Sequence, residues 1–160
     1  MGTRSRIGVM HGDKVKSVYC HWDGYLEHNG RILSENYDSA KANNLVALGD
    51  LSSLRPDIGD KHPFSPHDLP EDMRDMTIGE FNAKFENMCT FYGRDRGETG
   101  TEFQVAHTFA EFMTQCDNSG AEYYYIMKDG EWYCGDTYGS TPISNKLVPL
   151  TEALTTTEEA

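Results

Sequence analysis

Segments 121–128 and 131–136 limit most strongly what this chain folds into, because both are rich in strand-forming aromatic residues and only two residues separate them. Those residues, Asp129 and Gly130, favour the tight turn whose backbone twist matches a β-hairpin. Aromatic rings are frequent on both segments, which is typical of packing between paired strands, although an exposed ring also suits stacking on a base. The sequence therefore predicts an antiparallel hairpin near the carboxyl end.

A second hairpin is predicted near the amino end. In segments 5–11 and 14–22, apolar and polar residues alternate well enough for two strands, and Gly12 and Asp13 between them supply the turn. We expect the two hairpins to build one antiparallel sheet, which the segments between them cover.

The segments between the hairpins carry apolar residues at helical spacing. We predict helices at 26–37 and 40–48, the second capped by Ser39. Capping-box patterns that begin at Thr77 and Thr108 predict two more. The predicted fold class is α+β, with an antiparallel β-sheet built from the N- and C-terminal hairpins and helices packed on one face.

The length of 160 residues is that of one domain with a sizeable core, and we place this domain at 1–150. Segment 50–76 holds repeated prolines and is predicted to be a long irregular loop. The tail 151–160, rich in Thr and Glu, is expected to be disordered.

The charge balance narrows the partners. With 26 acidic and 14 basic side chains the net charge is −12, so diffuse binding to nucleic acid or to an anionic membrane is not expected. No apolar run has membrane-spanning length and no signal peptide is visible, which predicts a cytoplasmic protein. The four cysteines are far apart and read as reduced thiols, consistent with that compartment; they are Cys20, Cys89, Cys116 and Cys134.

A dense polar motif, HWDGY at 21–25, follows the second predicted strand, at the kind of position where scaffolds present chemistry. His21 and Asp23 offer polar contacts, and Trp22 and Tyr25 offer rings to pack against a base or ribose. Strand alternation places Trp22 on the face opposite to His21. We therefore expect Trp22 to lie in the core and His21 to reach a pocket.

A second polar motif, YGRDRGE at 92–98, holds two arginines separated by one residue. In an extended segment the guanidinium groups of Arg94 and Arg96 point the same way, which suits phosphate or carboxylate binding. Arg4 and Arg6 have the same spacing near the amino end. The alternative is that each arginine forms an ordinary ion pair with one of the many acidic residues.

Other chemistries have weaker support in the sequence. A metal site at His21 and Asp23 would need further ligands, and His62, His67 and Asp68 have no spacing that fixes them there. No glycine-rich phosphate loop, nucleophile elbow or zinc finger is present. We therefore assign no catalytic residue, no metal ligand and no cofactor.

Five stretches together resemble a widespread family of small phage and prophage proteins. They are TRSRI at 3–7, HWDGY at 21–25, ALGDLSSL at 47–54, YGRDRGE at 92–98, and EYYY at 122–125 with WY at 132–133. Leu26 stands where that family tends to have Pro, and Arg55, in the predicted loop, stands where it tends to have Gly. The resemblance implies a phage context, in which small accessory proteins counter host defences, and it implies no enzyme activity.

The leading hypothesis is a counter-defence protein that binds and sequesters an anionic nucleotide signal. Arg4, Arg94 and Arg96 would hold phosphates, while His21, Trp22, Asp23 or Tyr25 would contact the base or ribose. One alternative is an acidic inhibitor or nucleic-acid mimic that binds a host defence nuclease. Another is a nucleotide-cleaving enzyme with His21 as acid or base. The ligand, the host target and assembly into a homo-oligomer stay open.

Overall fold

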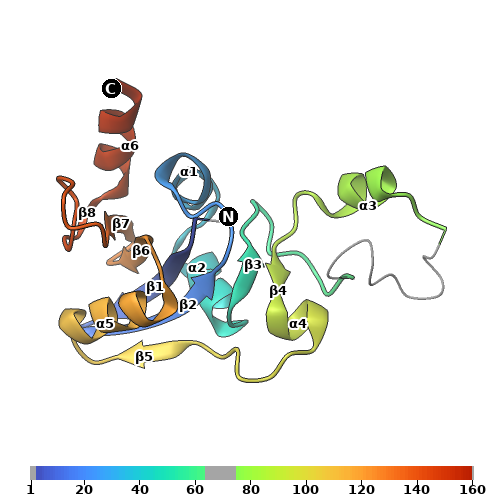
Figure 1. Cartoon of the computed structure of the whole chain (residues 1–160), viewed down its shortest axis with the longest axis horizontal. Helices are drawn as coiled ribbons and strands as arrows, with labels where there is room; N and C mark the ends of the chain where they lie inside the picture. Colours follow the sequence, from blue (N-terminus) through green and yellow to red (C-terminus); the bar gives the residue numbers. More distant parts are fainter. Residues whose placement is uncertain (1–2, 64–74, 160) are drawn as a thin grey trace.

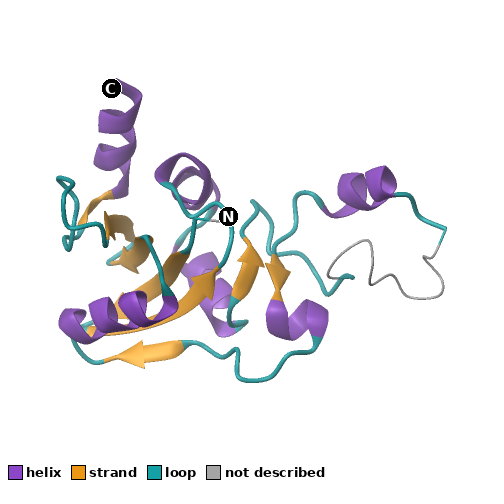
Figure 2. Cartoon of the chain, viewed as in Figure 1, coloured by secondary structure: helices purple, strands orange, loops and turns teal. Residues whose placement is uncertain are grey.

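A computed structural model describes residues 3–63 and 75–159 of the chain (Figure 1). It confirms the α+β class, because helices pack around an eight-stranded, mostly antiparallel sheet (Figure 2). The strands are β1 (Ser5–His11), β2 (Lys14–Cys20), β3 (Leu51–Ser53), β4 (Thr90–Phe91), β5 (Gln104–Ala106), β6 (Tyr123–Lys128), β7 (Glu131–Asp136) and β8 (Val148–Pro149). The helices are a π-helical turn η1 (Leu26–Gly30), α1 (Arg31–Asn36), α2 (Ser39–Ala47), α3 (Ile78–Phe85), α4 (Tyr92–Arg96), α5 (Phe109–Ser119) and α6 (Leu150–Glu159).

Both predicted hairpins are confirmed, and they form the centre of the sheet. β1 pairs antiparallel with β2, and β6 pairs antiparallel with β7. Asp129 and Gly130 have φ angles of 52° and 80°, the left-handed turn that this dipeptide favours. A parallel pairing of β1 with β6 over five residue pairs joins the hairpins, giving the order β4-β3-β2-β1-β6-β7-β8.

The β2 strand has two partners on its outer edge. Its first half, Val15 to Ser17, pairs antiparallel with β5, and Cys20 at its end pairs parallel with β3. The sheet therefore forks at this edge, and the end of β2 meets β3 and β4 rather than β5 (Figure 1). This fork brings the HWDGY and YGRDRGE motifs into the same region.

Most helices pack on one face of the sheet and bury the larger core. α2 buries the stripe predicted for it, Ala42, Leu45 and Val46. α1 adds Leu33 and α6 adds Leu150 to the same cluster. Burial of these side chains against the apolar residues of the sheet stabilises this layer.

The opposite face is covered by α5, which departs from the expectation of helices on one face. Phe112 and Cys116 of α5 pack against Val15, Tyr124 and Ile126 of the sheet. The reason is that β6 is apolar on both sides, so each face of its hairpin needs a cover. The two hydrophobic clusters are therefore separated by the sheet itself.

Several helix ends differ from the prediction. Segment 26–37 divides into η1 and α1. The cap of α2 is Asp38, not Ser39, because its carboxylate accepts a hydrogen bond from the Lys41 backbone at 2.8 Å. The capping box that begins at Thr77 is confirmed at the start of α3.

The tail expected to be disordered from residue 151 is helix α6 instead. Its Leu150, Ala153 and Leu154 follow i, i+3, i+4 spacing and pack into the larger core. Thr and Glu at the intervening positions concealed this stripe.

The segment predicted to be an irregular loop, 50–76, contains the short strand β3. Residues 64–74 lie outside the described residues, and so do His67 and Asp68. Among the described residues, no helix has both the length and the apolar character that crossing a membrane requires.

Candidate functional site

Trp22 is exposed, contrary to the prediction that it lies in the core. Strand β2 ends at Cys20, and the next backbone amides bond to the β3 side: His21 N donates to the Leu51 carbonyl at 3.1 Å and Trp22 N to the Ser52 carbonyl at 3.0 Å. The chain then bends, so strand alternation no longer decides where the indole goes. Trp22 keeps 43% of its surface exposed.

His21 is held by a hydrogen bond to Tyr19. The Tyr19 hydroxyl lies 2.7 Å from His21 Nδ1, and Arg4 lies near enough to Tyr19 to lower the pKa of its hydroxyl. A hydroxyl either donates to an imidazole nitrogen or accepts from it, so Nδ1 is engaged in either tautomer. His21 Nε2 has no hydrogen-bond partner in the part of the chain that the structure describes.

The surroundings hold the Tyr19–His21 hydrogen bond in place. Burial raises the pKa of Tyr19, and the nearby Arg4 charge opposes that rise. The backbone amide of Tyr19 donates to the Asp50 carboxylate at 2.9 Å. Arg4 lies beside the carboxyl end of α5, where a Cβ at Gly120 would meet the guanidinium at 3.0 Å. A cation is favoured at that end of a helix.

The Trp22 indole packs on His21. The ring centroids are 4.6 Å apart and the planes are nearly perpendicular, at 88°. An edge-to-face pair of this kind fixes the orientation of both rings while leaving one side of the indole open. We call Arg4, Tyr19, His21 and Trp22 the indole face.

Tyr92 and Arg96 border the indole face from α4. Burial raises the pKa of Tyr92, and Ser52 and Arg96 oppose that rise. Tyr92 in turn contributes to the raised pKa of Tyr19, so α4 lies close to the indole face. Arg96 is 53% exposed and lies 3.6 Å from Glu98.

Asp23 and Tyr25 turn away from His21 and associate with His28. The Asp23 carboxylate lies 4.0 Å from His28 Nε2, and the Tyr25 and His28 ring centroids are 6.0 Å apart. Gly24 between them is buried, and a Cβ there would lie 2.7 Å from the Cβ of Ser5. The motif therefore divides into two groups, and only His21 and Trp22 join the indole face.

Buried Asn29 holds this loop in place, a role that the sequence did not suggest. Its side-chain amide donates to the Trp22 carbonyl at 3.3 Å and to Ser5 Oγ at 3.4 Å. Tyr125 donates to the Gly24 carbonyl at 2.5 Å. Strand alternation places Tyr19 and His21 on the same face of segment 14–22, and this is the one signal in the sequence for the contact between them.

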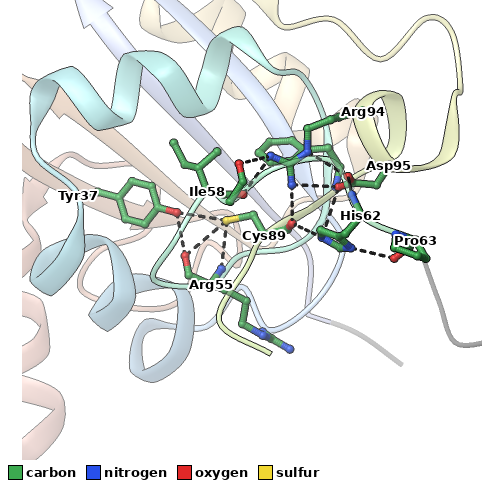
Figure 3. A network of polar contacts seen from close by, with 10 residues as sticks. Tyr37, Arg55, Ile58, His62, Pro63, Cys89, Arg94 and Asp95 are labelled. Carbon is green, nitrogen blue, oxygen red and sulfur yellow. Dashed lines mark hydrogen bonds and ion pairs between the residues drawn. The ribbon is translucent and has the colours of Figure 1, made fainter. Parts of the chain in front are cut away.

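Arg94 and Arg96 do not form the predicted pair. They lie on helix α4 rather than on an extended strand, so their side chains point about 200° apart around the helix axis. Arg94 is 13% exposed, and all five of its N–H donors have acceptors. Two contact the Asp95 carboxylate, at 3.0 and 3.2 Å, and three contact the carbonyls of Ile58, Gly59 and Cys89, at 2.8–3.0 Å (Figure 3).

Asp95 is the centre of this network and is itself fully satisfied. Its side chain has no exposed surface. Besides Arg94, it accepts hydrogen bonds from the backbone amides of His62, at 3.0 Å, and Phe91, at 2.8 Å. An ionised carboxylate accepts about four such bonds, so Asp95 is held as the anion.

His62 completes the network. Its Nδ1 lies 2.8 Å from the Pro63 carbonyl and its Nε2 lies 2.9 Å from the Cys89 carbonyl (Figure 3). Both carbonyl oxygens are acceptors, so whichever ring nitrogen carries a hydrogen donates it to a carbonyl. Asp95 Oδ2 lies 3.7 Å from Nε2. We call His62, Arg94 and Asp95 the arginine clamp.

The arginine clamp ties segment 58–63 to β4 and α4, and it has a structural role. Because all five Arg94 donors have acceptors in the protein, Arg94 has no donor left for a phosphate, and we do not carry its predicted ligand role forward. The alternative reading, a structural ion pair, is the one that the geometry supports for this residue. Arg4 and Arg96 keep exposed positions.

No family model matches the chain, and no curated protein and no solved structure matches it either. Within the described ranges, no group of three or more His, Cys, Asp or Glu side chains is placed to hold a metal ion.

Proposed function

We propose that this protein binds and sequesters an anionic nucleotide on the indole face. The observation that carries the proposal is the exposed Trp22 ring beside a His21 whose Nε2 is unpartnered among the described residues. An open indole suits stacking on a base, which stabilises binding by about 1–3 kcal/mol per base. In the proposed complex, His21 Nε2 hydrogen-bonds to the ribose and the exposed Arg4 contacts phosphate oxygens.

Sequestration is favoured over turnover by the state of the nearest thiol. Cys20 is buried, and burial raises its pKa to about 12, so it is a poor nucleophile at neutral pH. In this proposal His21 presents Nε2 to the ligand, while its contact with Tyr19 at Nδ1 holds the ring in place.

The biological setting is part of the proposal. In the phage context that the five motifs suggest, the ligand is a nucleotide signal of a host defence system, and the protein acts in the host cytoplasm. Its four cysteines are free and buried, which fits a reducing compartment.

Mass spectrometry of molecules released by heat from the purified protein tests this proposal. We expect an intact nucleotide, which then rebinds to the emptied protein in a calorimetric titration with saturation at a fixed stoichiometry. Recovery of a cleaved nucleotide would favour the enzyme instead. Absence of any nucleotide, together with no heat from a panel of mono-, di- and cyclic nucleotides, would overturn the proposal and leave the acidic mimic as the better hypothesis.

A further inference from the structure

A cavity lies between α3 and the ends of β3 and β4, separate from the indole face. Its volume is about 320 Å³, and all of its lining residues belong to the described part of the chain. That volume is at the lower end of the range for small-molecule sites, which is roughly 300–1,000 Å³. The cavity therefore has room for one small molecule.

Two opposite charges line this cavity and do not neutralise each other. Arg55 uses one nitrogen to donate to the Leu54 carbonyl at 3.0 Å, and no carboxylate of the described residues lies within ion-pair distance of it. Glu86, also in the lining, has no cation within that distance among the same residues. Arg55 contrasts with Arg94, whose donors are all engaged.

The remaining lining gives the cavity an apolar side and a polar side. Phe81, Phe85 and Met88 provide the apolar side, and the two phenyl rings are 4.9 Å apart. Ser53 and Thr90, which pair across β3 and β4, line it from the sheet. Neither hydroxyl has a hydrogen-bond partner among the residues that the structure describes.

One wall is rigid. The His62 ring stacks on Phe85 with centroids 4.9 Å apart and an interplanar angle of 19°. His62 is itself held by the Pro63 and Cys89 carbonyls (Figure 3). A wall that does not rearrange on binding reduces the entropy that a ligand must overcome.

We propose that this cavity binds a free α-amino acid with an apolar side chain. Arg55 receives the carboxylate, for which a guanidinium is geometrically suited, and Glu86 receives the ammonium group. The apolar side chain packs on Phe81, Phe85 and Met88. A zwitterion satisfies both charges at once, whereas a simple anion or cation leaves one of them unmatched. This site is independent of the nucleotide proposed for the indole face.

Three probes that share a phenyl ring test the proposal by calorimetric titration of the full chain: phenylalanine, 3-phenylpropionate and phenethylamine. We expect phenylalanine to bind at least about tenfold more tightly than either analogue, since each analogue lacks one charged contact. Equal affinity for phenylalanine and 3-phenylpropionate, or no saturable binding of any probe, would overturn the assignment.

Two variants check the residues. Arg55→Met keeps the side-chain stem and the backbone bonds of Arg55 to Cys89, so it should fold; it should weaken phenylalanine about tenfold and leave phenethylamine unchanged. Glu86→Gln should show the reverse selectivity, losing phenylalanine affinity without affecting 3-phenylpropionate. Lys14→Met and Glu131→Gln, exposed charge changes elsewhere, are the matched controls and should change none of the three affinities. Equal losses in the controls would attribute the effect to net charge.

Discussion

The arginine clamp and the indole face both arise from polar motifs rich in charged or aromatic residues, yet they have opposite character. In the clamp, Arg94, Asp95 and His62 satisfy one another and nearby carbonyls completely, and their side chains are almost entirely buried. At the indole face, Trp22 is exposed, and Tyr19 engages only Nδ1 of His21, which leaves Nε2 without a partner among the described residues.

The two regions differ in the number of donors that their side chains leave unused, and we use this number to separate a structural group from a proposed binding group. Arg94 has the residue type that phosphate sites use, but it has no donor left. Arg55, in the α3 cavity, and Arg4, at the indole face, have the same chemistry with fewer internal partners. Burial and hydrogen-bond counting therefore decide what each arginine does, and residue type does not.

The largest expected effect separates Arg94 from Arg96. Arg94→Ala leaves the buried Asp95 carboxylate without its main partner, so the free energy of unfolding should fall by about 3–5 kcal/mol. Arg96→Ala, at an exposed position on the same short helix, should cost less than about 1 kcal/mol. Urea denaturation of both variants measures the difference. Similar small losses in the two would mean that the clamp does not stabilise the fold.

The two tryptophans offer the next comparison. Trp22→Ala should change stability by less than about 1 kcal/mol but weaken nucleotide binding by about 1–3 kcal/mol, the contribution of one stacked base. Trp132→Ala is the matched control: Trp132 is 6% exposed and donates to the Tyr37 carbonyl at 2.9 Å, so its loss should destabilise the fold by about 3–5 kcal/mol. Thermal melts and titrations of both variants check this. An unfolded Trp22 variant would return that side chain to the core.

Tyr19→Phe should have a smaller effect that concerns His21 alone. Removing the hydroxyl takes away the hydrogen bond at His21 Nδ1, so the ring is held less firmly and ligand affinity should fall by about 1 kcal/mol. Calorimetric titration of the variant measures this loss. An unchanged affinity would show that Tyr19 does not position His21 for binding.

The smallest expected effect is a pH dependence at Asp50. Burial raises the pKa of this carboxyl above its ordinary value of 3.8, against the opposing effects of the Tyr19 amide and Arg6. The folded chain thus binds this proton more tightly than the unfolded chain, so this group's contribution to stability is lost as pH rises from about 3.8 through the raised value.

Asp50→Asn keeps an oxygen to accept from Tyr19 and removes the titration. Relative to the unsubstituted protein, the variant should therefore gain stability as pH rises from acid to neutral. Denaturation at a series of pH values measures that difference. A difference that does not change with pH, or that changes in the opposite direction, would show that the Asp50 carboxyl is not held in this way.

The sequence by itself determined the features that depend on neighbouring residues. Local steric and hydrogen-bonding preferences explain the turn at Asp129 and Gly130, the amino-terminal hairpin, the buried stripe of α2 and the capping box at Thr77. The HWDGY motif is a candidate site from sequence alone because it follows a predicted strand.

The tertiary structure alone decided which groups remained available. The parallel pairing of β1 with β6 joins segments more than a hundred residues apart, and Arg94 finds its carbonyl acceptors at Ile58 and Gly59, 36 and 35 residues away in the chain. Local patterns do not encode such partners, because a donor bonds to whatever acceptor the fold brings within reach. The exposure of Trp22 and the saturation of Arg94 are both consequences of those distant contacts.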